Sequence, residues 1–275
     1  MDLTIDSSIT LNNGVEMPLF GLGVYQAGSG QGTIRAVRWA LEAGYRHIDT
    51  AKLYGNEVEV GKAVRQSGVP REEIFITTKL WNSDHGFDQA LRAFDESLRK
   101  LDLGYIDLYL IHWPVSQQRD ESWRALQTLL ETDQCRAIGV SNYTIQHLDE
   151  LLSWADVAPA VNQVEFSPYL YQEELLAYCR EHEIQLEAYS PLTKGRMLDD
   201  PPLVAVAEKY DKSPAQILIR WALQHRVVVI PKSSTKAHIR ANADVFDFEI
   251  APEDMARLDE LDRGLRVSWD PSDIA

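Results

Sequence analysis

The sequence contains little cysteine and no long apolar run. Cys135 and Cys179 are the only two cysteines in 275 residues, and they form no CxxC pair, so we expect neither a disulfide framework nor a cysteine metal site. No apolar stretch approaches the roughly 20 residues that span a bilayer. Residues 1–8 also lack the basic start of a signal peptide. These absences predict a cytoplasmic protein that does not bind membranes.

Positive charge is scarce as well. The chain has 27 Lys and Arg against 42 Asp and Glu, which gives a formal net charge of −15. A surface of this sign repels nucleic acid and anionic membranes, so we expect neither as a partner. Any phosphate-bearing ligand must therefore meet a local basic site. The apolar fraction of 45 % is ordinary for a globular protein and excludes a disordered chain.

Short apolar strands alternate with amphipathic helices from residue 19 onward. Each predicted strand is followed by a helical pattern, and the strands lie at residues 19–25, 47–50, 74–80, 106–113, 137–142, 160–166, 185–190 and 226–232. This alternation implies parallel strands joined by helical crossovers, and eight such units close as a (β/α)8 TIM barrel. We therefore expect an α/β protein with a single barrel domain over residues 1–275.

The sequence predicts two additions to the barrel, and one other fold is an alternative. An Asn-Gly pair within residues 9–18 indicates an N-terminal β-hairpin, and residues 251–262 form an extra C-terminal helix pattern. The rival is a doubly wound open sheet. It is disfavoured because Gly21, Gly23 and Gly28 do not give the GxGxxG spacing after the first strand.

Polar side chains stand at the ends of the predicted strands. Within GYRHIDTAKLYGNEVEVG, residues 44–61, Asp49 ends the second strand and Tyr54 lies in the loop after it. Lys79 ends the third strand and His112 the fourth; later strands add Ser141 and Asn142, Gln163, Tyr189, and Lys232 with Ser233. The C-terminal ends of barrel strands meet at one face, which is where barrel active sites are built. We therefore expect a site there.

The first four of these residues suggest acid/base chemistry. A lysine inside an apolar strand needs a negative partner, and Asp49 on the adjacent strand is available to Lys79. We expect the Lys79 ammonium to favour the phenolate and so to lower the pKa of Tyr54, making that phenol a proton donor. His112 would orient a substrate oxygen. Taken singly, each residue also has an ordinary structural explanation.

Other chemistries are weaker candidates. Asp49 and His112 could bind a metal, but the other strand ends supply no further histidine or carboxylate, so no metal is expected. A nucleophilic hydrolase would need a serine or cysteine activated by a base. A barrel isomerase or lyase with a Schiff base on Lys79 remains an alternative. A proton donor without metal or nucleophile suits carbonyl reduction, if a hydride source is bound.

The sequence resembles the aldo-keto reductases over nearly its whole length. The runs GYRHIDTA from residue 44, RAIGVSNY at 136–143 and VIPKS at 229–233 resemble three family signatures in order. IFITTKLWN at 74–82 and IDLYLIHWP at 106–114 are similar to the short prokaryotic reductases of 2,5-diketo-D-gluconate, methylglyoxal and related carbonyls. The resemblance implies an NADPH-dependent, cytoplasmic, monomeric oxidoreductase that reduces aldehydes and small ketones.

The resemblance also implies roles for individual positions. Asp49, Tyr54, Lys79 and His112 would be the catalytic tetrad, with Tyr54 as general acid. The cofactor would be bound by Gly23, Val24, Ser141, Asn142, Gln163, Tyr189, Ser190, Lys232, Ser233, His238 and Asn242. Within this set, the nicotinamide carboxamide would be held by Ser141, Asn142 and Gln163. Tyr189 would stack on the ring, and Lys232 with Ser233 would hold the 2′-phosphate. The substrate would contact Tyr25, Trp81, Trp113 and Trp269.

The sequence departs from the family at the phosphate end. Arginine is usual at the position of His238 and an acidic residue at that of Ala241, whereas Asn242 is retained. Histidine can stack on adenine but cannot make the bidentate phosphate contact of arginine. We therefore expect a weakened preference for NADPH, with NADH as a second cofactor. Some relatives are non-catalytic structural proteins of the same fold, and this is the alternative function.

Overall fold

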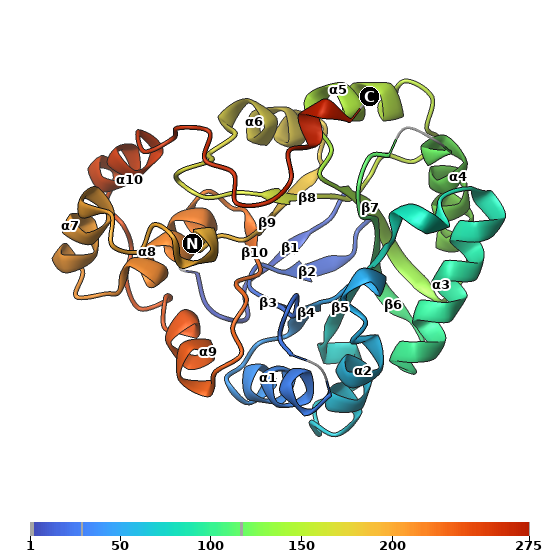
Figure 1. Ribbon diagram of the computed structural model, residues 1–275, viewed down its shortest axis with the longest axis horizontal. Helices are drawn as coiled ribbons and strands as arrows, with labels where there is room; N and C mark the ends of the chain where they lie inside the picture. Colours follow the sequence, from blue (N-terminus) through green and yellow to red (C-terminus); the bar gives the residue numbers. More distant parts are fainter. Residues whose placement is uncertain (1–2, 29, 116–117, 275) are drawn as a thin grey trace.

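Eight parallel strands form the centre of the computed structural model, which describes residues 3–28, 30–115 and 118–274 (Figure 1). They pair in chain order: β3 Leu22–Gly23, β4 His47–Asp49, β5 Phe75–Leu80, β6 Ile106–Ile111, β7 Cys135–Ser141, β8 Val161–Glu165, β9 Gln185–Tyr189 and β10 Val228–Val229. Parallel bridges from Phe20 to Val229 and from Gly23 to Lys232 join the first strand region to the last. The predicted barrel is confirmed.

Helices surround the strands, as Figure 1 shows. In the described ranges they are α1 Gln31–Glu42, α2 Glu57–Arg65, α3 Phe87–Leu101, α4 Arg119–Leu130, α5 Ile145–Leu152, α6 Glu173–Glu181, α7 Pro201–Lys209, α8 Pro214–Gln224, α9 Lys236–Ala243 and α10 Pro252–Asp259. The predicted C-terminal helix corresponds to α10. Capping boxes begin α5 at Thr144 and α8 at Ser213, where a side-chain oxygen accepts a backbone N–H of the first turn.

The predicted N-terminal hairpin is present and lies at the barrel end opposite to the strand C-termini. Its strands are β1 Ser8–Thr10 and β2 Glu16–Pro18. In the connecting turn, Asn12 donates to the Pro159 carbonyl and Asn13 to the Arg136 carbonyl. Pro159 precedes β8 and Arg136 stands at the start of β7, so the turn lies against the N-terminal ends of these strands.

The strands are buried on both faces, which explains their near-continuous apolar sequence. Every residue of β5 and β6 is buried, as expected for a parallel sheet between a packed interior and a ring of helices. Gly61 of α2 shows how closely that ring packs. A Cβ at this position would lie 1.8 Å from the Leu101 carbonyl oxygen at the end of α3, so no larger residue fits without backbone movement.

The C-terminal tail crosses the molecule after α10. In Figure 1 it is the red segment that runs from α10 past α6 to α5. Both carboxylate oxygens of Glu165, at the end of β8, accept backbone N–H groups of the tail, from Val267 at 2.6 Å and Ser268 at 3.0 Å. Farther along, a ring nitrogen of His147 lies 2.7 Å from the Ile274 carbonyl oxygen. The tail is therefore attached to the barrel at both ends of its last segment.

Candidate active site

A cavity of about 670 Å³ opens at the C-terminal ends of the strands. Most of the predicted site residues line it: Gly23, Tyr25, Asp49, Tyr54, His112, Trp113, Ser141, Asn142, Gln163, Tyr189, Ser190, Lys232 and Trp269. The strand register brings them together, because parallel strands of a closed barrel all end at this face. Residues separated by more than 200 positions in the sequence thus share one cavity.

Lys79 and Asp49 form a buried ion pair beneath the cavity. Lys79 Nζ lies 2.6 Å from Asp49 Oδ2, and the two side chains are 0 % and 3 % exposed. The ammonium also donates to the Thr50 carbonyl oxygen at 2.9 Å. Burial raises the pKa of Asp49, while the Lys79 ammonium opposes that rise. The predicted partnership of these two residues across neighbouring strands is therefore present, and each charge is compensated.

Tyr54 lies on a 3-10 turn, Lys52–Tyr54, directly after β4. Its ring centroid is 4.9 Å from that of Tyr25 and 5.8 Å from that of His112. Burial, together with the charge of Asp49, raises the pKa of the Tyr54 phenol well above 10. The expectation that Lys79 lowers this pKa was wrong. The ammonium lies 5.1 Å from the centre of the Tyr54 ring, but its charge is neutralised by Asp49 at half that distance.

His112 is the next strand-end residue round the barrel and is only 7 % exposed. Its ring packs edge-on against Trp81, with centroids 5.2 Å apart. Burial and the nearby Lys79 charge lower its pKa well below 6.5, so the imidazole is neutral at physiological pH. A neutral imidazole keeps one N–H, which can be donated to an oxygen in the cavity.

Three polar groups form a chain along the next strands. Ser141 donates to the Gln163 carbonyl oxygen at 2.8 Å. Asn142 has a positive φ of 65°, which turns its amide back so that it donates to the His112 carbonyl oxygen at 2.9 Å. The Tyr189 hydroxyl in turn donates to Asn142 Oδ1 at 2.8 Å. These bonds fix the three side chains at the cavity surface before any ligand binds.

Aromatic rings line the cavity opening. Tyr25 and Trp269 are 45 % and 65 % exposed, which is unusual for residues of their size. Trp269 comes from the C-terminal tail, and its ring centroid lies 5.5 Å from that of buried Trp113. Trp81 borders His112 from outside the cavity lining. Tyr25 and Trp269 are therefore not core residues.

Comparison with known proteins matches this geometry. Residues 20–263 match the sequence model of the Aldo/keto reductase family. The chain belongs to this family. It is 50 % identical over 274 residues to glyoxal reductase of Bacillus subtilis (strain 168), covering 100 % of this chain and 99 % of the relative. Both the predicted family and the predicted class, oxidoreductase, are thereby confirmed.

Solved structures of family members superpose closely. An aldo-keto reductase from a Medee basin deep-sea metagenome library has a TM-score of 0.94 at 45 % identity, covering 98 % of this chain and 100 % of that one. A Bombyx mori aldo-keto reductase, solved in complex with NADP, has a TM-score of 0.89 at 38 % identity, covering 97 % of this chain and 96 % of that one. The barrel is thus the fold of these reductases.

Several residues assigned through the family resemblance lie away from the cavity lining. Val24 is fully buried, and its backbone N–H and C=O are bonded to Asp49 and Asn56. Ser233 precedes α9, whereas His238 and Asn242 lie on that helix, His238 exposed and Asn242 buried. Lys232, the residue before Ser233, does line the cavity. Their assignment to a cofactor stays a prediction.

Two residues were missed at the sequence level. Lys194, in the loop after β9, lines the cavity and donates to the Val267 carbonyl oxygen at 2.6 Å. Glu187, in β9, is fully buried and accepts a hydrogen bond from Gln163 Nε2 at 2.8 Å. The sequence pattern could have identified Glu187, because a carboxyl inside the apolar strand QLEAY is as unusual as Lys79 inside FITTKL.

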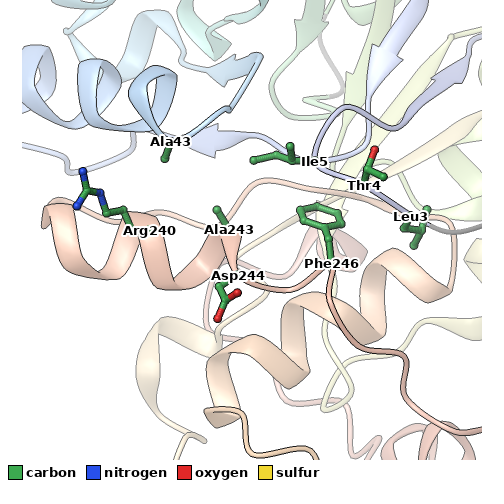
Figure 2. A pocket seen from close by; sticks show the side chains of 8 residues that line it. All are labelled: Leu3, Thr4, Ile5, Ala43, Arg240, Ala243, Asp244 and Phe246. Atoms are coloured by element: carbon green, nitrogen blue, oxygen red, sulfur yellow. The ribbon is translucent and has the colours of Figure 1, made fainter.

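A second depression, shown in Figure 2, lacks the chemistry of a reductase site. It measures about 460 Å³ and lies between residues 3–5, the end of α1 and α9, with Arg240 and Asp244 as its charged members. Within the described ranges, no group of three or more His, Cys, Asp or Glu is placed to hold a metal ion. The helices of those ranges are also too short or too polar to cross a membrane.

Proposed function

We propose that the protein is an NADPH-dependent carbonyl reductase that converts aldehydes and small ketones to alcohols. The observation that carries the proposal is the position of Tyr54, a phenol that lines the cavity beside the His112 ring and the buried Lys79–Asp49 pair. Reduction of a carbonyl needs a proton for the oxygen as well as a hydride for the carbon. NADPH, when bound, supplies the hydride.

The residues of the cavity fit such a cofactor. Ser141, Asn142 and Gln163 present a hydroxyl and amides, which suit a neutral carboxamide, and Tyr189 offers an aromatic face. Lys194 and Lys232 supply two cations in a protein whose net charge is −15, which meets the need for a local basic site for phosphate. Gly23 packs closely against the last strand region, because a Cβ there would lie 3.0 Å from the Ile230 carbonyl oxygen.

Each member of the tetrad has a defined task in this proposal. Tyr54 donates the proton to the carbonyl oxygen, and His112, kept neutral by burial, donates a hydrogen bond to the same atom without competing for the proton. Lys79 packs its ammonium 5.1 Å from the centre of the Tyr54 ring, which is a cation–π contact with the phenol. Asp49 holds Lys79 in place.

We infer the substrate class, the second cofactor, the location and the oligomeric state from the composition of the chain and from its similarity to known reductases. The similarity to a glyoxal reductase favours small dicarbonyl substrates such as methylglyoxal or 2,5-diketo-D-gluconate. NADP(H) is the proposed cofactor, as in the Bombyx mori relative, with NADH as a second one because His238 replaces the usual arginine. A cytoplasmic location, a monomeric state and a single domain are further proposals. A non-catalytic role is disfavoured, since all four tetrad positions are filled.

The test is a spectrophotometric assay. NADPH absorbance should fall on addition of methylglyoxal or a simple aromatic aldehyde, and borohydride should leave no substrate adduct on Lys79. If NADPH binds but no carbonyl of a broad panel is reduced, the non-catalytic alternative is correct. An adduct on Lys79 would instead support a Schiff-base isomerase or lyase.

A further inference from the structure

Glu187 of β9 has no task in the proposed chemistry, yet it lies in the barrel interior beside residues that do. We infer that Glu187 is a positioning residue that, together with Asp49, fixes the orientation of the Gln163 amide for a carboxamide ligand. Gln163 Nε2 lies 2.8 Å from Asp49 Oδ2 and 2.8 Å from Glu187 Oε2. The inference rests on the proposed cofactor site.

The two contacts define which way the amide faces. A glutamine amide has two N–H donors and one carbonyl oxygen. Both N–H groups of Gln163 are used by the carboxyls of Asp49 and Glu187, and a turned amide would bring its carbonyl oxygen against Asp49 Oδ2, the acceptor for Lys79. Because Gln163 also lines the cavity, the group that it can offer to a ligand is its carbonyl oxygen. That atom is complementary to the N–H of a carboxamide.

Asp49 alone would hold the amide less firmly. Its Oδ2 also accepts from Lys79, and the terminal torsion of glutamine is broad, so one bond leaves the amide free to rotate. Glu187 supplies the second acceptor from the other side. Parallel register in β8 and β9 pairs Gln163 directly with Glu187, so the contact is built into the sheet.

The burial of Glu187 and its few contacts support the same role. The side chain is 0 % exposed, and its single hydrogen bond within the described ranges goes to Gln163. Glu187 Oε1 has no hydrogen-bond partner there, and the His47 ring lies 3.6 Å from it. Burying a carboxyl costs stability, whereas an apolar side chain at this place would cost none. Burial also raises the pKa of Glu187.

The experiment compares an apolar variant with a conservative one. Glu187→Met removes the acceptor at similar volume, whereas Glu187→Gln retains an acceptor oxygen. Binding of NADP⁺ is measured by isothermal titration calorimetry, so the readout does not depend on turnover. We expect Glu187→Met to weaken NADP⁺ binding by roughly threefold to tenfold, the range of one hydrogen bond, and Glu187→Gln to stay within about twofold of wild type.

A double-mutant cycle shows whether Glu187 acts through Gln163. In a Gln163→Met background, Glu187→Met should weaken NADP⁺ binding no further. Independent, additive losses would overturn the inference, as would a lower melting temperature with unchanged binding. If Glu187→Met and Glu187→Val both fail to fold while Glu187→Gln folds, the residue serves the core and the inference is wrong. Wild type that does not bind NADP⁺ would overturn the proposed function as well.

Discussion

The ammonium of Lys79 lies 2.6 Å from the carboxylate of Asp49, and both groups are sealed inside the barrel. Neither charge could be buried alone, because an isolated ion in a protein interior loses its hydration without compensation. Burial, with the charge of Asp49 adding to it, keeps the neighbouring phenol of Tyr54 protonated. With its charge neutralised, Lys79 does not pull the proton from Tyr54, which stays an acid until the reaction takes its proton.

Removing the Lys79 ammonium should destabilise the protein, because the buried Asp49 carboxylate then has no cationic partner. Lys79→Met is expected to lower the free energy of unfolding by roughly 3–5 kcal/mol at neutral pH, as measured by urea denaturation. The double variant Lys79→Met with Asp49→Asn leaves no buried charge and should recover a large part of that loss. Equal or greater destabilisation in the double variant would show that the pairing is not what stabilises Asp49.

Loss of the Tyr54 hydroxyl should separate chemistry from binding. Tyr54→Phe is expected to lower kcat at least about a hundredfold, because a general acid contributes on the order of a hundred- to ten-thousandfold. Binding of NADP⁺ by calorimetry should be unchanged. Tyr109→Phe is the matched control, since Tyr109 is a buried tyrosine of β6 packed on Phe94 of α3. Normal turnover in Tyr54→Phe would remove this residue from the mechanism.

His238 should set the balance between the two nicotinamide cofactors. It is exposed on α9, one turn beyond the Thr235 cap. His238→Arg is expected to raise the ratio of kcat/KM for NADPH over NADH by about tenfold, because a bidentate phosphate contact is gained. His182→Arg, at the end of α6, adds the same charge away from the cavity. If both variants shift the ratio equally, the effect is one of net charge.

The buried carboxyl of Glu187 should make stability depend on pH. Burial, with the Asp49 charge adding to it, raises the pKa of Glu187 from 4.5 to about 8. Between these values the folded protein retains a proton that the unfolded chain releases, so stability falls as pH rises. Glu187→Gln cannot titrate. Its melting temperature should therefore exceed that of wild type by a margin that grows from about pH 5 to about pH 8. A margin that is constant with pH would contradict the raised pKa.

Much of the barrel could be predicted because each strand shows its own pattern. Apolar runs that end in a polar residue marked the strands, and Lys79 within FITTKL called for Asp49 as a partner. The last strand was predicted too long, over residues 226–232, whereas β10 is Val228–Val229. Pro231 follows closely and has no N–H to donate, which limits the ladder.

Two features of the site depend on contacts between residues that are far apart in the sequence, so local sequence patterns do not predict them. The direction of the Tyr54 pKa shift follows first from the burial of the phenol and then from the charge of Asp49, and both depend on the folded structure. The contact between Gln163 and Glu187 requires the register of β8 against β9, which pairs two residues 24 positions apart. Sequence supplied the residue types, and only the closed barrel supplied the geometry between them.

The attachments of the C-terminal tail hold part of the cavity lining in place. Glu165 holds the backbone at Val267 and Ser268, and His147 holds it at Ile274, so Trp269 lies in a short span with both ends tethered. A span of this length has little conformational freedom. The ring of Trp269 is therefore held at the cavity and against Trp113, whereas the same ring on a free terminus would sample a much larger volume.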